Sequence, residues 1–158
     1  MAKSNPSFFK GDFALVFFTS LLMFTAFYFM LPTLPVFLTR ELEIDEAQTG
    51  IILSVYTLAA LLIRPFTGFF IDRYGRKFFY LPSLLLFAVL FLAYPFAGIF
   101  VIMLIVRFVH GAIWGVSTTT GSTLIVDIVP ADRRGEGIGL YGLAMTFPMA
   151  LGPFIGLQ

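Results

Sequence analysis

The chain has 158 residues, of which 59% are hydrophobic and 12% are charged, with a mean hydropathy of +0.95 and a formal net charge of +1. A soluble domain carries about 25% charged residues, so this composition excludes an ordinary water-soluble fold and indicates a protein of the lipid bilayer. Cysteine is absent, which excludes disulfides and cysteine-based metal sites, and basic runs no longer than two residues argue against a nucleic-acid partner.

Five apolar segments are long enough to cross a bilayer, since a helix needs about 20 apolar residues to span the hydrocarbon core. We expect transmembrane helices at residues 13–38, 49–71, 78–95, 99–129 and 138–157. The first segment is too long for the apolar region of a signal peptide, which has roughly 7–15 residues, and no small-residue cleavage pattern follows it. The predicted fold is therefore an all-α membrane bundle that retains its first helix.

Most of the ten lysines and arginines fall on one side of this predicted topology. They lie before the first helix, between the second and third, or between the fourth and fifth, whereas the loop after the first helix is acidic. By the positive-inside rule, we expect a cytoplasmic N-terminus and a multi-pass protein of the cell membrane. These basic residues are Lys3, Lys10, Arg73, Arg76, Lys77, Arg133 and Arg134.

The second predicted helix ends in a charged stretch, residues 68–77, which reads GFFIDRYGRK. Asp72 would lie at the C-terminal end of that helix, where the helix dipole disfavours a carboxylate by a few tenths to ~1 kcal/mol. Arg73 and Arg76 are near enough to compensate for the negative charge. Gly75 permits the turn into the third helix, because glycine adopts positive φ without steric strain.

The spacing of these residues resembles the signature loop between helices 2 and 3 of major facilitator superfamily transporters. In that family the loop is a cytoplasmic latch, which closes the gate in the outward-facing state. The resemblance implies that Asp72, Arg73 and Arg76 form the latch. Gly68 and Gly75 would make its geometry possible, Gly68 by letting another helix approach closely. The alternative is a loop whose charges only fix the topology.

Asp127 is a second carboxylate at the cytoplasmic end of a predicted helix, the fourth. In the family, an acidic residue at this place commonly joins the latch arginine in a charge relay. The resemblance therefore implies that Asp127 approaches Arg76. A solvated aspartate near Arg133 and Arg134 is the alternative.

The fourth predicted helix carries Arg107 well inside the membrane, where an arginine costs ~2.5–3.5 kcal/mol and usually faces a bundle interior or a watery cavity. Arg107, Gly111, Gly115 and Thr118 share one face of small residues suited to tight packing. The run RFVHGAIWG is similar to the family's helix 4 motif, whose arginine is associated with proton coupling. The resemblance implies this role for Arg107, with His110 in place of the usual glutamine. Snorkelling of Arg107 and a packing role for His110 are the alternatives.

Several polar residues are candidates for the wall of a solute cavity. Thr25, Tyr28 and Trp114 are weak candidates by the family resemblance. The hydroxyl residues within 117–123 either bond their own helix or line a polar path, and the sequence does not choose between these. Arg64, near the cytoplasmic end of the second helix, is expected to snorkel rather than to bind.

The fifth predicted helix approximates the family's helix 5 antiporter motif and departs from it at Pro148 and Leu157. The match favours export over uptake, and small-residue packing around a proline kink is the alternative. The residues that carry the match are Gly139, Pro148, Gly152, Pro153 and Gly156.

No nucleophile with a paired base and no cluster of metal-ligating residues is visible in the sequence, so we expect neither an enzyme nor a metal site. The segment 137–142 matches a dinucleotide fingerprint, but it opens a membrane helix instead of following a strand. We therefore expect no cofactor, with the proton gradient as the energy source.

The resemblance covers nearly the whole chain and points to the drug-efflux branch. Family members usually have twelve helices in two halves, with the solute bound between them. Residues 1–158 would form part of the N-terminal domain, with helix 6 and the C-terminal half missing, and would not transport alone. The expected function is proton-coupled efflux of small organic solutes by alternating access. The alternatives are proton-coupled uptake of a sugar or metabolite, and a truncated segment with only a structural or interaction role.

Overall fold

The computed structural model describes residues 11–156, and this part of the chain is helical almost throughout. The prediction of an all-α fold with five long apolar helices is confirmed, and each is long and apolar enough to cross a membrane when the third is taken together with the 3₁₀ segment that follows it. The helices are α1 (Asp12–Arg40), α2 (Glu46–Tyr74), α3 (Arg76–Leu90), α4 (Phe100–Ile128) and α5 (Arg134–Gly156).

The bounds differ from the predicted ones in two informative places. The predicted helix at 78–95 is α-helical only to Leu90 and continues as a 3₁₀ segment, η1 (Phe91–Phe96). Pro95 explains the change, because it has no N–H to donate to the carbonyl of Phe91. A second 3₁₀ segment, η2 (Ala131–Arg133), leads directly into α5, which therefore begins before the predicted residue 138. Residue 157, the predicted end of the last helix, lies outside the described residues.

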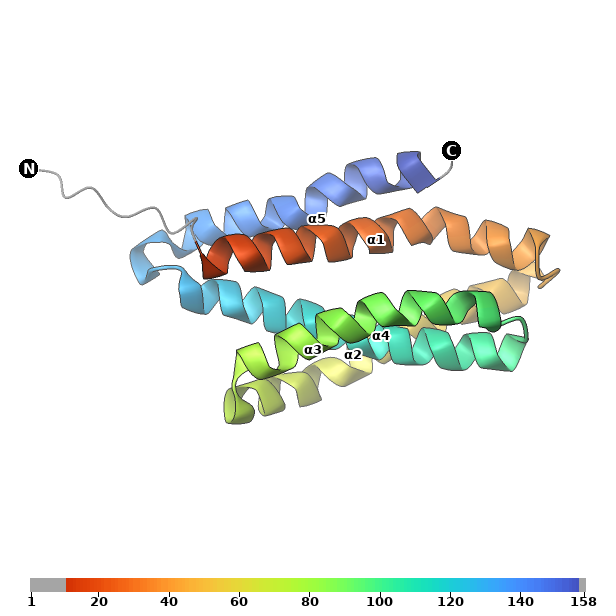
Figure 1. Cartoon of the computed structure of the whole chain (residues 1–158), viewed down its shortest axis with the longest axis horizontal. Coiled ribbons are helices and arrows are strands. Elements are labelled where there is room, and N and C mark those ends of the chain that lie inside the picture. The colour runs from red at the N-terminus through yellow and green to blue at the C-terminus, as the bar shows by residue number, and fades with distance from the viewer. Residues whose placement is uncertain (1–10, 157–158) are drawn as a thin grey trace, which may run out of the picture.

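The helices run alternately up and down, and α4 is the central one (Figure 1). It contacts α2 and α3 on one side and α1 and α5 on the other, while α1 and α5 pack on each other. In the most apolar window of α4, 39% of the residues are buried, against 17–28% in the other four helices. Large apolar side chains such as Leu22, Phe78 and Leu85 face outward on the remaining helices, which suits a lipid environment.

Two glycines explain the close contact between α4 and α2. A Cβ atom at Gly111 would overlap the backbone carbonyl of Tyr56, and one at Gly115 would lie 2.7 Å from the carbonyl oxygen of Ala60. Small residues let two helix backbones approach at this distance, as the sequence pattern predicted. The contact fixes the position of every side chain that α4 presents to α2.

The contact between α1 and α5 uses the C-terminal part of the predicted helix 5 motif. A Cβ at Gly152 would lie 2.6 Å from the Cβ of Tyr28, and one at Gly156 would lie 2.6 Å from the carbonyl oxygen of Phe29. Pro148 is buried in the same helix, and Pro153 is partly buried.

Gly139 does not share this packing, and the prediction that it belongs to the packed face is wrong for the described residues. It is exposed, and no atom lies within 4 Å of the position that a Cβ would occupy there. Gly137 is the small residue that packs at this end of α5, where a Cβ would collide with the side chain of Val129. The α4–α5 connection, which brings Val129 back over α5, determines which of the two glycines is covered.

A group of hydroxyls that the sequence analysis did not identify joins three helices inside the bundle. The hydroxyl of Tyr80 in α3 lies 2.8 Å from Oγ1 of Thr19 and 3.0 Å from Oγ of Ser20, both in α1. Oγ of Ser20 also lies 3.2 Å from the hydroxyl of Tyr141 in α5. Polar groups away from water need partners of this kind, so the group helps to fix α3 and α5 against α1.

Candidate functional site

Three connections meet at one end of the bundle. The N-terminal end of α1, the turn between α2 and α3, and the connection between α4 and α5 lie together there (Figure 1). This end carries the basic residues that lie between the helices, and it is where the predicted latch residues are found.

Gly75 makes an abrupt turn between α2 and α3. Its φ of 95° and ψ of 139° lie in a region open mainly to glycine, so the predicted positive φ is present although the residue is not in the left-handed helical region. Its N–H donates to the carbonyl of Ile71 at 3.1 Å, which closes the last turn of α2. Since α3 begins at Arg76, the turn places the side chain of that residue beside Asp72.

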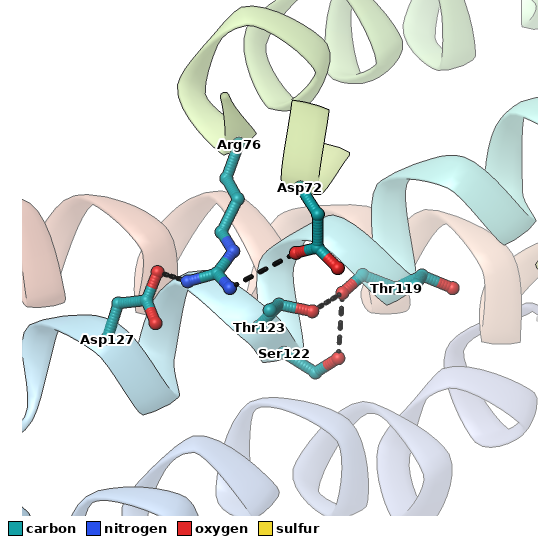
Figure 2. A network of polar contacts seen from close by, with 6 residues as sticks. All are labelled: Asp72, Arg76, Thr119, Ser122, Thr123 and Asp127. Carbon is teal, nitrogen blue, oxygen red and sulfur yellow. Dashed lines mark hydrogen bonds and ion pairs between the residues drawn. The ribbon is translucent and has the colours of Figure 1, made fainter. Parts of the chain in front are cut away.

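Arg76 bridges two carboxylates from different helices, as Figure 2 shows. Its Nη2 lies 3.4 Å from Oδ1 of Asp72 in α2, and its Nη1 forms an ion pair with Oδ2 of Asp127 in α4. The expected approach of Asp127 to Arg76 is therefore present. We refer to Asp72, Arg76 and Asp127 as the clasp.

The clasp lies at the edge of the bundle and not in its core. The side chain of Arg76 is 28% exposed and that of Asp127 is 45% exposed. Ion pairs of such exposure contribute only about 0–1 kcal/mol to stability. The clasp lines an open cavity of about 410 Å³ between α2, α3 and α4. A weak, water-accessible ion pair of this kind can break and form again when the helices that it joins move apart and together.

Two predicted latch residues lie outside the clasp. The guanidinium of Arg73 is positioned over the ring of Tyr74, 5.5 Å from its centroid, and makes no ion pair with the described residues. The prediction that Gly68 lets another helix approach is wrong within residues 11–156, because nothing lies within 4 Å of a Cβ there. The buried residues Thr67 and Ile71 make the contact of this part of α2, so Gly68 faces away from α4.

The neighbouring charges have partners of their own. Nζ of Lys77 lies 2.6 Å from Oδ2 of Asp12, an ion pair between α3 and α1 that the sequence analysis did not find. Arg133 forms a two-point pair with Glu136, at 2.8 Å for both contacts. Asp127 is therefore bound by Arg76 across helices, and the alternative of a solvated aspartate beside Arg133 and Arg134 is not what the structure shows.

Arg107 is deeply buried in α4, with 4% of its surface exposed. Its guanidinium carbon lies 4.1 Å from the ring centroid of Tyr56, and its Nη1 lies 3.4 Å from the hydroxyl of Tyr94 in η1. The predicted position inside the bundle is correct, and the alternative of snorkelling is not. No acidic side chain of the described residues pairs with it, so an aromatic face and a hydroxyl are its observed partners.

His110 shares the Tyr94 hydroxyl with Arg107. Its Nδ1 lies 2.9 Å from that hydroxyl, and the residue is 1% exposed. Since Arg107 can only donate, the hydroxyl accepts from Arg107 and has its own proton to donate to Nδ1. Nε of Arg107 and Nε2 of His110 have no hydrogen-bond partner among the described residues. Tyr94, which the sequence analysis did not single out, is thus the link between the two predicted coupling residues.

A second open cavity of about 390 Å³ lies on the opposite side of α4 from α3, where α1, α2, α4 and α5 converge. Tyr28 and Trp114 are on its wall, as predicted. Thr25 does not line this cavity, and its hydroxyl donates to the carbonyl of Leu21 in its own helix at 2.7 Å. The wall includes Phe24, Tyr28, Arg64, Trp114, Thr118, Thr119, Ser122, Tyr141 and Met145.

Two hydroxyl residues of α4, Thr118 and Ser122, both line this cavity and bond their own helix. Oγ1 of Thr118 donates to the carbonyl of Trp114 at 2.9 Å. Oγ of Ser122 donates to the carbonyl of Thr119 at 3.0 Å, a bond that Figure 2 shows. Each hydroxyl oxygen keeps lone pairs that can accept a further hydrogen bond. The two possibilities left open by the sequence are therefore compatible.

Comparison with known proteins agrees with these observations. A family model described as Major Facilitator Superfamily matches residues 16–157. Among curated proteins, the chain is similar to the Quinolone resistance protein NorA of Staphylococcus aureus, at 26% identity over 141 residues. It is also similar to an uncharacterized MFS-type transporter of Methanocaldococcus jannaschii, at 30% identity over 128 residues.

The matches cover most of this chain but a minor part of each relative. The alignment with the Staphylococcus aureus protein takes in 89% of this chain and 36% of the relative, and the archaeal one takes in 81% and 33%. The chain therefore spans about a third of the length of these relatives.

Proposed function

The chain belongs to the major facilitator superfamily, a family of transporters, and from this premise we propose that it is the N-terminal part of a proton-coupled exporter of small organic solutes. It is a multi-pass protein of the cell membrane. Its partners are then the bilayer, the transported solute and the C-terminal half of the same transporter. Alternating access would expose the solute site first to one side of the membrane and then to the other.

The observation that carries this proposal is the clasp. Arg76 is the first residue of α3, and it binds Asp72 at the end of α2 together with Asp127 near the end of α4. It therefore ties three helices at one mouth of the bundle through side chains that remain accessible to water. We assign this end, and with it the N-terminal end of α1, to the cytoplasmic side, because Arg73, Arg76, Lys77, Arg133 and Arg134 lie at its connections.

The buried group on α4 supports the coupling part of the proposal. A buried arginine without an acidic partner is costly in a membrane, and such residues are associated with ion or proton pathways. Arg107 is such a buried arginine, and His110 is buried beside it. Each has one nitrogen without a hydrogen-bond partner within the described residues. We assign proton coupling to Arg107, with His110 and Tyr94 positioning it.

Export is favoured over uptake by two observations. The relative in Staphylococcus aureus is named for quinolone resistance. In addition, Gly152 and Gly156 of the predicted antiporter motif pack α5 against α1, and Gly152 does so at Tyr28, which is on the wall of the cavity. The substrate cavity would then be the one walled by Tyr28 and Trp114, completed by the other half of the transporter.

The test uses the full-length coding sequence, expressed in cells from which inside-out membrane vesicles are prepared. With an acidic vesicle interior, the vesicles should accumulate a fluorescent organic solute, and a protonophore should abolish the accumulation. Saturable accumulation in right-side-out vesicles only, with sugars or metabolites, would instead establish uptake. Residues 1–158 alone, reconstituted in liposomes, should give no saturable flux, and proton-driven flux by this chain alone would contradict the proposal.

A further inference from the structure

We propose that Arg64 forms, with the aromatic residues around it, a subsite for the anionic group of an aromatic solute. The inference rests on the proposed transport function and adds the chemical class of the substrate. It concerns the cavity at the junction of α1, α2, α4 and α5.

Arg64 reaches this cavity from α2 and is the only charged residue on its described wall. Each of the other three helices contributes an aromatic side chain to the same wall: Tyr28 in α1, Trp114 in α4 and Tyr141 in α5. Phe24 packs edge-on against Trp114, with 5.1 Å between the ring centroids, which fixes the indole in place. The cavity thus combines one positive charge with a rigid aromatic surface.

The charge of Arg64 is unneutralised. Arg76 has two carboxylates, and Arg107 has a tyrosine ring and a hydroxyl, whereas Arg64 makes no ion pair or side-chain hydrogen bond with residues 11–156. Its guanidinium therefore gives the cavity wall a positive charge. Arg64 is exposed on the open wall of the cavity, so its donors are accessible to a ligand that enters there.

The shape of the guanidinium defines what would neutralise it. Its planar fork of donors matches a carboxylate, sulfonate or phosphate with two parallel hydrogen bonds. The hydroxyl oxygens of Thr119 and Ser122 on the same wall can accept hydrogen bonds from polar groups of a ligand. Flat apolar rings suit the tryptophan and tyrosine surfaces. An aromatic anion satisfies all of these features, and an aromatic cation would be repelled by Arg64.

Two probes with the same ring and opposite permanent charges test the inference: 2-naphthalenesulfonate and (2-naphthyl)trimethylammonium. In inside-out vesicles that contain the full-length transporter, wild type should transport the sulfonate in preference to the ammonium. Arg64→Gln should lower kcat/KM for the sulfonate by about tenfold or more, because it removes a charge-assisted two-point contact. The ammonium should be transported as well as before or better. Arg64→Lys should retain most of the preference, and Arg134→Gln, an equal loss of charge outside the cavity, should not change it.

A second variant guards against failure of Arg64→Gln to fold. Ser122→Asp adds a carboxylate to the same wall at an exposed position, and it should shift the preference toward the ammonium. An unchanged ratio of the two probes in both folded variants would overturn the inference and leave the transport proposal intact.

Equilibrium dialysis of the purified full-length protein separates the inference from the proposed function. If wild type moves neither probe yet binds the sulfonate in a manner that Arg64→Gln weakens about tenfold, the transport proposal fails and the subsite stands. If wild type does not bind the sulfonate, or binds both probes equally, the subsite is excluded.

Discussion

Arg76 at the start of α3 forms an ion pair with Asp127 near the end of α4, although α4 makes its most extensive contact with α2. The pair bridges the helices from a partly exposed position, next to an open cavity of about 410 Å³. Its contribution to the stability of the bundle is small for that reason. The ion pair is therefore better suited to stabilising one conformation of a transporter than to stabilising the fold.

Removal of either side of the clasp should slow transport more than it destabilises the protein. In the full-length transporter, we expect Arg76→Gln to reduce proton-driven flux by up to about fivefold, the effect of a conformational bias of up to about 1 kcal/mol. The melting temperature in detergent should change little, because a partly exposed pair contributes about 0–1 kcal/mol. Flux into inside-out vesicles and thermal unfolding of the purified protein are the two measurements.

Asp127→Asn provides the matched variant, and the double variant tests whether the residues act together. If they form one contact, Arg76→Gln with Asp127→Asn should be no slower than the slower single variant. Arg134→Gln, which removes a positive charge at the same end of the bundle, should leave the flux unchanged. Additive losses from the two single variants would show that the ion pair is not the functional unit.

Tyr94 should matter for stability through its hydroxyl alone. Tyr94→Phe leaves Nη1 of Arg107 and Nδ1 of His110 without their shared partner in a buried place. Each unsatisfied buried group costs about 1–3 kcal/mol, so the variant should unfold at a clearly lower temperature. Tyr74→Phe is the control, since Tyr74 is 57% exposed. Equal melting temperatures for the two variants would mean that water replaces the Tyr94 hydroxyl.

His110 and Arg107 should respond differently to substitution. His110→Gln keeps a group that can accept from the Tyr94 hydroxyl, and we expect it to retain proton-driven flux with a similar pH profile. Arg107→Gln removes the buried positive charge and should abolish coupling, so that solute moves only down its own gradient. Flux measured with and without a proton gradient distinguishes coupled from uncoupled transport. Loss of coupling in folded His110→Gln would identify His110 itself as a proton carrier.

Much of the fold could be predicted from the sequence because the signals are local. Long apolar segments give the five helices, and the spacing of Gly111 and Gly115 gives the face on which α4 meets α2. The contact of Arg76 with Asp127 was expected from the family resemblance, whereas the residues alone left Arg133 and Arg134 open as partners of Asp127.

The features that the sequence did not predict depend on which helix packs against each residue. Gly68 and Gly139 were predicted to be packed, but a small residue permits a close approach without causing it, and no described helix comes near either one. The depth of Arg64 followed from its position in α2, but its place on a cavity wall depends on how α1, α4 and α5 are arranged. Tyr94 was missed because its hydroxyl acts on residues of another helix, and a tyrosine near a loop gives no sign of this in the sequence.

The close contact of α4 with α2 should be sensitive to a single methyl group. Gly111→Ala places a Cβ against the carbonyl of Tyr56, which belongs to the backbone and cannot rotate away. We expect a loss of about 1–3 kcal/mol from the free energy of unfolding, as for overpacked cores. Gly142→Ala in α5 has open space and should be neutral or stabilising, since alanine favours a helix by up to about 1 kcal/mol over glycine. Equal stabilities in a denaturant titration would show that the helices separate freely.

Replacement of Gly75 should lower the stability of the protein by straining the backbone. A Cβ there meets no atom within 4 Å, so any penalty in Gly75→Ala comes from its φ of 95° and not from a clash. Backbone strain of this kind costs about 1–3 kcal/mol, or the turn rearranges and moves Arg76 away from Asp127. Gly98→Ala is the control, since Gly98 has equally open space without a positive φ. We expect Gly75→Ala to lower both the unfolding temperature and the flux while Gly98→Ala lowers neither. A Gly75→Ala protein with wild-type stability and flux would mean that the turn tolerates another conformation and that the clasp does not depend on it.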